Sequence, residues 1–223
     1  MATIKAMTDH FTGFAIPDTP LTRKAHGFVQ GITTQAVLTH SVRSYLFGRA
    51  IGERHGLRAE HDYDDEVLFL ACVLHDVGLT ERGERGGRFE VDGADLAAEF
   101  LTEHGLAADR TRLAWEAIAL HTSLGIADRM RPEIALTHAG AGADVAAFGA
   151  EELPAGYADR VHAAYPRLGG GVELTELIVG QAARNPAKAP PFSFPGELLR
   201  QDVPGTAVLP WREVVTAAWS GVA

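Results

Sequence analysis

Apolar residues recur at intervals of three and four along most of this chain, and that spacing predicts α-helices. No stretch of useful length alternates apolar and polar residues, so no β-strand is expected. No internal repeat and no linker divides the sequence. We therefore predict an all-α fold, a single-domain helical bundle.

Helix start and stop signals fix the approximate limits of the predicted elements. Asp64-Asp65-Glu66 places acid at the positive end of a helix dipole, Pro132 suits a first helical turn, and Gly78 is a helix stop. The predicted helices cover about 21–55, divided near Gly31 or Thr33-Thr34, then 64–76, 92–104, 110–122 and 132–148, with further helices opening at 154, at 173 and after 210.

Two segments lack a helical pattern. Residues 81–88 are polar and glycine-rich, so they predict a loop that can shape substrate access. Residues 187–210 are rich in proline and predict an extended arm or cover. The expected organisation is an N-terminal extension over 1–21, a core over 22–148, and C-terminal helices with the arm over 149–223, packed on the same domain.

Composition narrows the class of protein. A chain of 223 residues that is 46% hydrophobic can bury one core and is short for two domains. The net charge of −9, without any run of Lys or Arg, argues against nucleic-acid and anionic-membrane partners. The longest apolar run is too short to span a bilayer, the first residues lack a secretion signal, and the single cysteine fits a reducing compartment. We expect a cytoplasmic protein, in which Trp211 and Trp219 can pack against a second subunit of a homo-oligomer.

The candidate chemistry centres on His75-Asp76, which follows the apolar run 67–74. An imidazole and a carboxylate at the end of a buried segment are costly without a partner, and a divalent metal satisfies both. His40 lies upstream and Asp144 downstream, each in a helical pattern. Any one of these residues alone is more simply a hydrogen-bonded core or capping residue. The ordered set of four favours a metal site, and its ligand types suit zinc, iron or manganese.

The pattern His40…His75-Asp76…Asp144 in a helical chain resembles the HD-domain superfamily of metal-dependent hydrolases, over a core of about 22–148. The stretches 74–80, 88–94 and 115–123 are most similar to the cyanamide hydratase-like branch. The resemblance implies that the four residues hold one divalent ion, with zinc as the first expectation and iron or manganese as alternatives. It also implies an HD-type fold.

The function that this resemblance implies is a metal-dependent hydratase or hydrolase acting on a small, mostly uncharged molecule. Water activated by the ion would add to cyanamide and give urea, formally a hydro-lyase reaction. His121 or Asp76 would give the nitrogen its proton. The plainer interpretation of His121 is a helix-terminal residue favoured by the dipole.

Two other functions stay open. Many phosphohydrolases of this superfamily carry a lysine directly after His-Asp-x-Gly, where a point charge can bind phosphate; here Leu79 takes that position. Arg43, or the loop residues Arg82, Arg85 and Arg88, could replace it. The second alternative is a non-catalytic module that keeps a structural metal or binds a ligand.

The remaining polar residues receive simpler interpretations. Either Glu90 or Asp92 could hydrogen-bond to a metal ligand and support it, or could shuttle protons. Asp92 also suits a helix N-cap. His138 lies six residues before Asp144, off its helical face, and is not expected to share its ion. Cys72 is expected to be a small core residue. The histidines expected on the surface are His10, His55, His61, His104 and His162.

Overall fold

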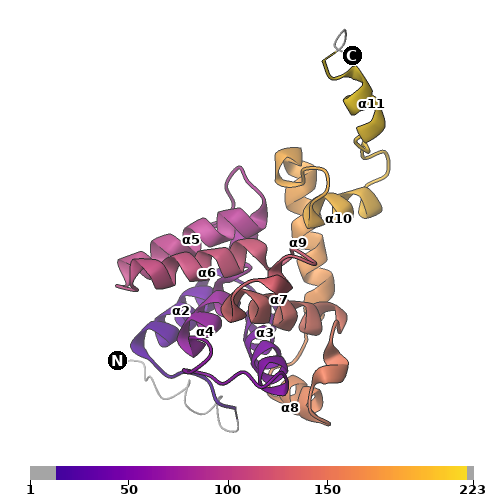
Figure 1. Cartoon of the computed structure of the whole chain (residues 1–223). Coiled ribbons are helices and arrows are strands. Elements are labelled where there is room, and N and C mark those ends of the chain that lie inside the picture. Colours follow the sequence, from indigo (N-terminus) through magenta and orange to yellow (C-terminus); the bar gives the residue numbers. More distant parts are fainter. Residues whose placement is uncertain (1–13, 220–223) are drawn as a thin grey trace.

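Two long helices, α3 (Gln35–Arg54) and α7 (Pro132–Ala146), lie against each other at the centre of the computed structural model, which describes residues 14–219. Four helices surround them, with α5 and α6 side by side and α2 packed on α4 (Figure 1). Their bounds are α2 Pro20–Ile32, α4 Asp65–Leu74, α5 Phe89–Glu103 and α6 Ala108–Leu120.

Glycines let α3 and α7 approach closely. A Cβ at Gly48 would overlap the backbone carbonyl of Leu136, and a Cβ at Gly140 would overlap that of Ser44. Such close backbone approach is open only to residues without a side chain. The helices run antiparallel in this register, so His40, one turn before Ser44, comes opposite the C-terminal end of α7.

Helix α4 is buried on every side, because residues 67–74 are at most 1% exposed. A helix that is apolar all round belongs in the core. Asp64 caps it by accepting a hydrogen bond from the backbone N–H of Val67 at 3.0 Å. The helix ends at Leu74, two residues before the predicted end, and the chain then makes the short 3-10 turn η1 (Val77–Leu79). The His75-Asp76 pair therefore stands between a core helix and a turn.

Gly78 explains the close fit of that turn. A Cβ at Gly78 would overlap the backbone carbonyl of Phe89 and crowd Gly93, so η1 rests directly on the backbone of α5. A glycine is therefore needed at this position for packing, in addition to its predicted role as a helix stop.

The C-terminal part packs along one side of the α3–α7 pair. Helices α8 (Tyr157–Ala164) and α9 (Gly170–Arg184) contact α3, and α10 (Phe194–Asp202) packs on α9. The short 3-10 turns are η2 Ala127–Arg129, η3 Ala150–Glu152 and η4 Pro186–Lys188. The last helix, α11 (Trp211–Ala217), projects away from the body (Figure 1).

The prediction of an extended arm over 187–210 is wrong for α10. Ser193 accepts a hydrogen bond from the backbone N–H of Gly196 and caps this helix, and Pro195 lies in the first turn. Proline is tolerated there, because the first N–H groups of a helix have no partner within it. Prolines that suggested an arm therefore open a helix.

The all-α prediction is confirmed. Over residues 14–219 the sole β-type pairing is an isolated bridge between Ala59 and Tyr63. The division near Thr33-Thr34 is also confirmed, with Thr34 capping α3, whereas α5 begins three residues before its predicted start. None of the described helices is both long and apolar enough to cross a bilayer. Trp211 and Trp219 are 60% and 84% exposed, and their packing on a second subunit stays a prediction.

Candidate metal centre and its cavity

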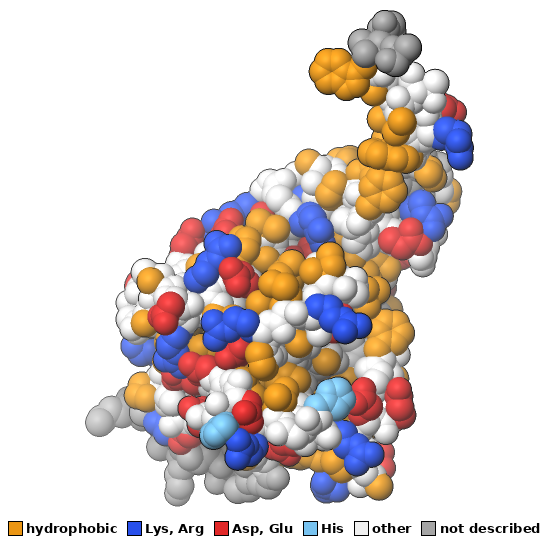
Figure 2. Space-filling model, viewed as in Figure 1, with side chains coloured by type: hydrophobic (Ala, Val, Ile, Leu, Met, Phe, Trp, Pro, Cys, Tyr) orange, Lys and Arg blue, Asp and Glu red, His pale blue; other side chains and the backbone are white. Residues whose placement is uncertain are grey.

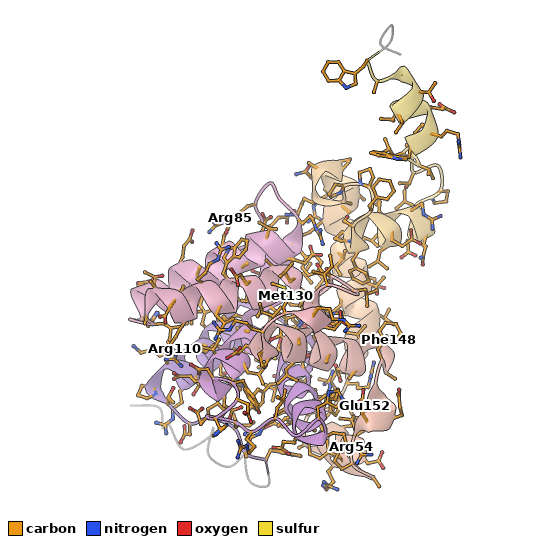
Figure 3. The ribbon with its side chains drawn as sticks, viewed as in Figure 1. Arg54, Arg85, Arg110, Met130, Phe148 and Glu152 are labelled. Atoms are coloured by element: carbon orange, nitrogen blue, oxygen red, sulfur yellow. The ribbon has the colours of Figure 1, made fainter. Side chains whose placement is uncertain are left out.

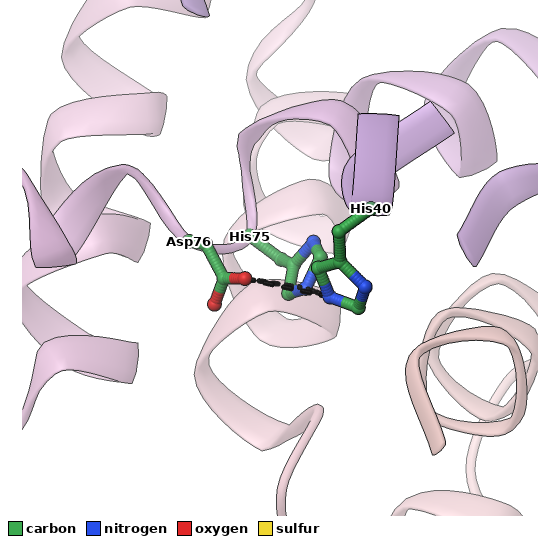
Figure 4. Close-up of side chains that lie close together, drawn as sticks. All are labelled: His40, His75 and Asp76. Carbon is green, nitrogen blue, oxygen red and sulfur yellow. Dashed lines mark hydrogen bonds and ion pairs between the residues drawn. The ribbon is translucent and has the colours of Figure 1, made fainter. Parts of the chain in front are cut away.

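Three buried side chains bring potential ligand atoms together where α3 meets the end of α4 (Figure 4). The Nε2 atoms of His40 and His75 lie 3.1 Å apart. The Asp76 Oδ2 atom lies 3.2 Å from His75 Nε2 and 3.5 Å from His40 Nε2. These three residues are between 1% and 4% exposed, so bulk water does not solvate them.

The hydrogen bonds made by the Nδ1 atoms of His40 and His75 indicate which ring nitrogen carries the proton. His40 Nδ1 lies 2.7 Å from the Asp144 carboxylate, and His75 Nδ1 lies 2.7 Å from the backbone carbonyl of Cys72. Both oxygens are acceptors, so both Nδ1 atoms donate, and in the neutral rings both Nε2 atoms carry lone pairs. The Asp76 Oδ2 atom has no hydrogen-bond donor. Three electron-rich atoms thus converge with no donor among them, and a divalent cation fits that set.

The close approach of these side chains shifts the pKa values of His75 and Asp76. Burial disfavours the charged form of His75, but the Asp76 carboxylate outweighs burial and raises the pKa of His75. Burial likewise opposes ionisation of Asp76, but His75, His40 and His121 together hold its pKa well below the usual range. The site therefore keeps Asp76 as an anion, ready to accept a cation.

Asp144 lies on the far side of His40 from the other two residues. Its carboxylate contacts His40 Nδ1 and is bound in bidentate fashion by Arg43, with Nε to Oδ1 at 2.6 Å and Nη2 to Oδ2 at 2.7 Å. Burial would raise the pKa of Asp144, but these donors lower it. The group of three does not include Asp144. In this geometry Asp144 orients the His40 ring, and its expected role as a fourth ligand stays a prediction.

His121 completes the inner surface from the end of α6. Its Nδ1 donates to the backbone carbonyl of Ile118 at 2.6 Å, and its Nε2 lies 3.9 Å from Asp76 Oδ1. Burial, together with the nearby His75, lowers the pKa of His121 to about 4. The neutral ring therefore presents an unprotonated Nε2 beside Asp76. This placement favours the interpretation of His121 as a residue of the site.

A cavity of about 230 Å³ opens above these residues. His40, His75, Asp76 and His121 line its inner end, while Phe89 of α5 and the α9 residues Leu174 and Ile178 line its walls. Leu79, at the position of the phosphohydrolase lysine, is 6% exposed and packs with those apolar walls. The substitution that the sequence analysis noted thus extends an apolar surface.

His138 is a cavity residue that the sequence analysis did not assign to the site. Its Nδ1 donates to the backbone carbonyl of His121 at 2.7 Å, which leaves Nε2 unprotonated in the neutral ring. Ala141, Gly142 and Val145 line the same cavity. These residues follow His138 by three, four and seven positions, so they share one face of the helix with it. That spacing was the signal in the sequence.

The arginines that could have bound phosphate have other partners, and no Lys or Arg lines this cavity among residues 14–219. Their partners are the Asp144 carboxylate for Arg43, the Phe28 ring for Arg82, Glu99 for Arg85 and Glu90 for Arg88.

The carboxylates of Glu90 and Asp92 hold the 81–88 loop in place through hydrogen bonds. Glu90 is fully buried and accepts hydrogen bonds from Arg88 and from Thr122. Asp92 is not an N-cap, because α5 begins at Phe89; its carboxylate instead accepts backbone N–H groups of the 81–88 loop. Both residues therefore organise the loop beside the cavity.

Cys72 and the histidines outside the site differ in burial. Cys72 is a buried core residue as predicted, and burial raises the pKa of its thiol to about 12. His55 and His61 are exposed as predicted, but His104 and His162 are half-buried. The His162 side chain is 33% exposed, and its Nε2 lies 3.7 Å from the Asp144 carboxylate, because α8 packs against α3. His10 lies outside the described residues.

Comparison with known proteins gives a consistent result. The model of the HD domain matches residues 37–164, more than half of the chain. Cyanamide hydratase DDI2 and cyanamide hydratase DDI3 of Saccharomyces cerevisiae (strain ATCC 204508 / S288c) are each 30% identical to it over 114 residues. That alignment covers 48% of this chain and 48% of each relative, so the chain matches about half the length of these curated proteins. The resemblance inferred from the sequence is confirmed, and the chain belongs to the HD-domain family.

Proposed function

We propose that this protein is a metal-dependent hydratase that adds water across the carbon–nitrogen triple bond of a small, uncharged substrate such as cyanamide. One observation carries the proposal. The Nε2 atoms of two histidines and a carboxylate oxygen without a hydrogen-bond donor converge at the inner end of a cavity that no Lys or Arg of the described residues lines. The relatives named cyanamide hydratase support the choice of substrate.

His40, His75 and Asp76 would hold the ion, and Asp144 would orient His40 from behind. Imidazole and carboxylate ligands suit zinc first, with iron or manganese as alternatives. Once bound, a divalent ion lowers the pKa of water and makes hydroxide available near neutral pH.

The proton movement falls to His121. The oxygen of water forms a bond to the nitrile carbon while one carbon–nitrogen π bond breaks, and the nitrogen then needs a proton. The unprotonated Nε2 of His121, held by the Nδ1 hydrogen bond to Ile118, can take a proton from water and return it to that nitrogen. The hydroxyl proton of this adduct then moves to the same nitrogen, so cyanamide and water give urea and nothing leaves. Asp76 Oδ1 lies 3.9 Å from that Nε2, so the carboxylate would stabilise the His121 ring while it carries the proton.

A phosphoester substrate is disfavoured by the same cavity. Phosphate recognition uses Arg or Lys, and the four candidate arginines bind other partners. A non-catalytic role is disfavoured because the three ligand atoms face a cavity rather than a closed core.

The test is urea release from cyanamide by the metal-loaded protein. We expect turnover that falls at least a hundredfold in His121→Ala and is unchanged in His61→Ala, a matched variant at an exposed histidine. A parallel screen with phosphoesters should give none. Cyanamide turnover no faster than in the metal-free control would reject this substrate.

A further inference from the structure

The cavity is larger than cyanamide requires. Its volume is about 230 Å³, whereas one water molecule needs roughly 10–15 Å³ of such space. Cyanamide contains only one carbon and two nitrogens besides hydrogen, so it would fill a small part of the space. Something larger is needed to exclude water from the site.

The extra space is apolar and uncharged. Phe89, Leu174 and Ile178 form the walls, and Asp76 at the inner end is the one charged side chain that lines the cavity in the described part of the chain. Phe148 and Leu124 at the rim are 62% and 69% exposed. Hydrophobic side chains gather on this face between the α5–α6 pair and α9 (Figure 2), and Phe148 lies on it beyond the end of α7 (Figure 3).

Three hydrogen bonds fix α9, and the turn η4 that follows it, to η1, α5 and the 81–88 loop. Gln181 on α9 donates from Nε2 to the backbone carbonyl of Gly78 at 3.0 Å. Lys188, only 2% exposed, donates from Nζ to Asp92 at 2.5 Å and to the backbone carbonyl of Arg85 at 3.1 Å. A wall held by buried polar contacts is preformed, which lowers the entropy cost of binding a ligand against it.

This wall also lies outside the part of the chain that defines the family. The family match ends at residue 164, while α9 begins at Gly170 and α10 at Phe194. The ligand atoms of the metal centre lie within the matched residues, and the wall residues Leu174 and Ile178 lie beyond them. The α9 part of the wall is therefore supplied by residues beyond the family match, whereas Phe89 lies within it.

From these observations we infer that the substrate is a nitrile or N-substituted cyanamide whose uncharged, apolar substituent packs against Leu174, Ile178 and Phe89. The inference rests on the proposed hydratase function and names its substrate class. Water adds across the triple bond, its oxygen to carbon and its two hydrogens to nitrogen, and the product is the matching amide or N-substituted urea. No group leaves and no oxidant or reductant is needed.

The first experiment compares cyanamide with N-methyl-, N-propyl- and N-butylcyanamide. Each added methylene buried in the cavity should raise kcat/KM about fourfold until the space is full. Ile178→Trp should narrow the cavity and lower kcat/KM for the butyl substrate at least tenfold more than for cyanamide. The matched control is Val172→Trp, on the same helix but 67% exposed and outside the cavity, which should keep the wild-type preference.

A second variant guards against misfolding. Ile178→Ala enlarges the cavity and should shift the preferred substituent to a longer chain, with folding checked by circular dichroism. Equal kcat/KM for cyanamide and butylcyanamide, with Ile178→Trp lowering both alike, would overturn the inference and leave the hydratase function standing.

Binding without turnover separates the two proposals. N-butylurea, a product analogue, should bind at least tenfold more tightly than urea by isothermal titration calorimetry, and Ile178→Trp should abolish that difference. If butylurea binds in this way but no cyanamide is hydrated, the hydratase function fails and the apolar subsite stands. If butylurea binds no better than urea, the inference fails whatever the turnover.

Discussion

The Nε2 atoms of His40 and His75 lie 3.1 Å apart, and the Nδ1 atom of each ring already has an acceptor. With both rings neutral, two lone pairs face each other, and a positive charge between them removes the repulsion. The raised pKa of His75 shows the same preference for positive charge at this point. The four-histidine arrangement of this region, with each Nδ1 held by an acceptor, therefore presents Nε2 atoms to the cavity.

Removing a ligand should remove the metal. His75→Ala and Asp76→Ala are each expected to lose bound metal by elemental analysis, while His61→Ala at the surface retains it. Chelation of the wild type should lower its Tm, because a ligand present at a thousandfold its Kd stabilises the folded state by about 4 kcal/mol. Full metal content in both site variants would defeat the ligand assignment.

The role of Asp144 can be separated from that of a ligand. Asp144→Asn keeps an acceptor for His40 Nδ1 but removes the charge, so we expect metal affinity to fall 10–100-fold, as for other partners of metal-bound histidines. Competition with a chelator of known affinity measures this. Complete loss of metal at saturating concentrations would instead favour direct ligation by Asp144.

Gly140→Ala should loosen the helix crossing that brings His40 and Asp144 together. The new Cβ would overlap the backbone carbonyl of Ser44, and neither helix can yield without moving the other. We expect a loss of 1–3 kcal/mol in the free energy of unfolding, measured by urea denaturation, together with weaker metal binding. Gly142→Ala is the matched control two residues away, since its Cβ meets only the Phe148 side chain at an ordinary 3.6 Å.

Asp64 should make stability depend on acid. Burial raises the pKa of Asp64, but hydrogen bonds from Arg110 and from the backbone of Val67 outweigh it and lower the pKa. The stabilisation is therefore present above the unfolded pKa of about 3.9 and is lost as the pH falls through the lower folded value.

Asp64→Ala should cost about 1 kcal/mol of unfolding free energy at pH 7, as loss of an N-cap does, and less below pH 4. Asp64→Asn, which keeps the cap but not the Arg110 ion pair, should lie between the wild type and the alanine variant. A penalty that is constant from pH 7 to pH 3 would contradict this account.

Cys72 should be inert in the folded protein. Its side chain is fully buried, and burial raises the pKa of the thiol to about 12, so almost no thiolate forms at pH 8. A disulfide reagent should label it only at the rate of unfolding, and at once in denaturant. Rapid labelling of the native protein would mean that the α4 core opens locally.

Local signals predicted much of the fold, and they singled out His40, His75 and Asp76, which the structure places together. The apolar run of α4, its acidic start at Asp64 and the break before Thr34 depend on neighbouring residues, so pattern alone locates them. The prolines around α10 misled, because the same residue opens helices and extends arms.

Packing between helices far apart in the sequence decides two features of the site. One is the side of His40 on which Asp144 lies, and the other is the position of the α9 wall. No local pattern encodes that geometry, and the sequence analysis did not assign His138 and the small residues beside it to the cavity that they line.

The hydrogen bond from Gln181 to Gly78 joins residues 103 positions apart in the sequence. Such a contact closes a long loop, and the entropy cost of closing that loop precedes any stability the contact contributes. During synthesis His40, His75 and Asp76 leave the ribosome well before α9 does. A nascent chain can therefore bring these ligands and Phe89 together before α9 exists, and the apolar wall is complete only when translation has passed residue 181.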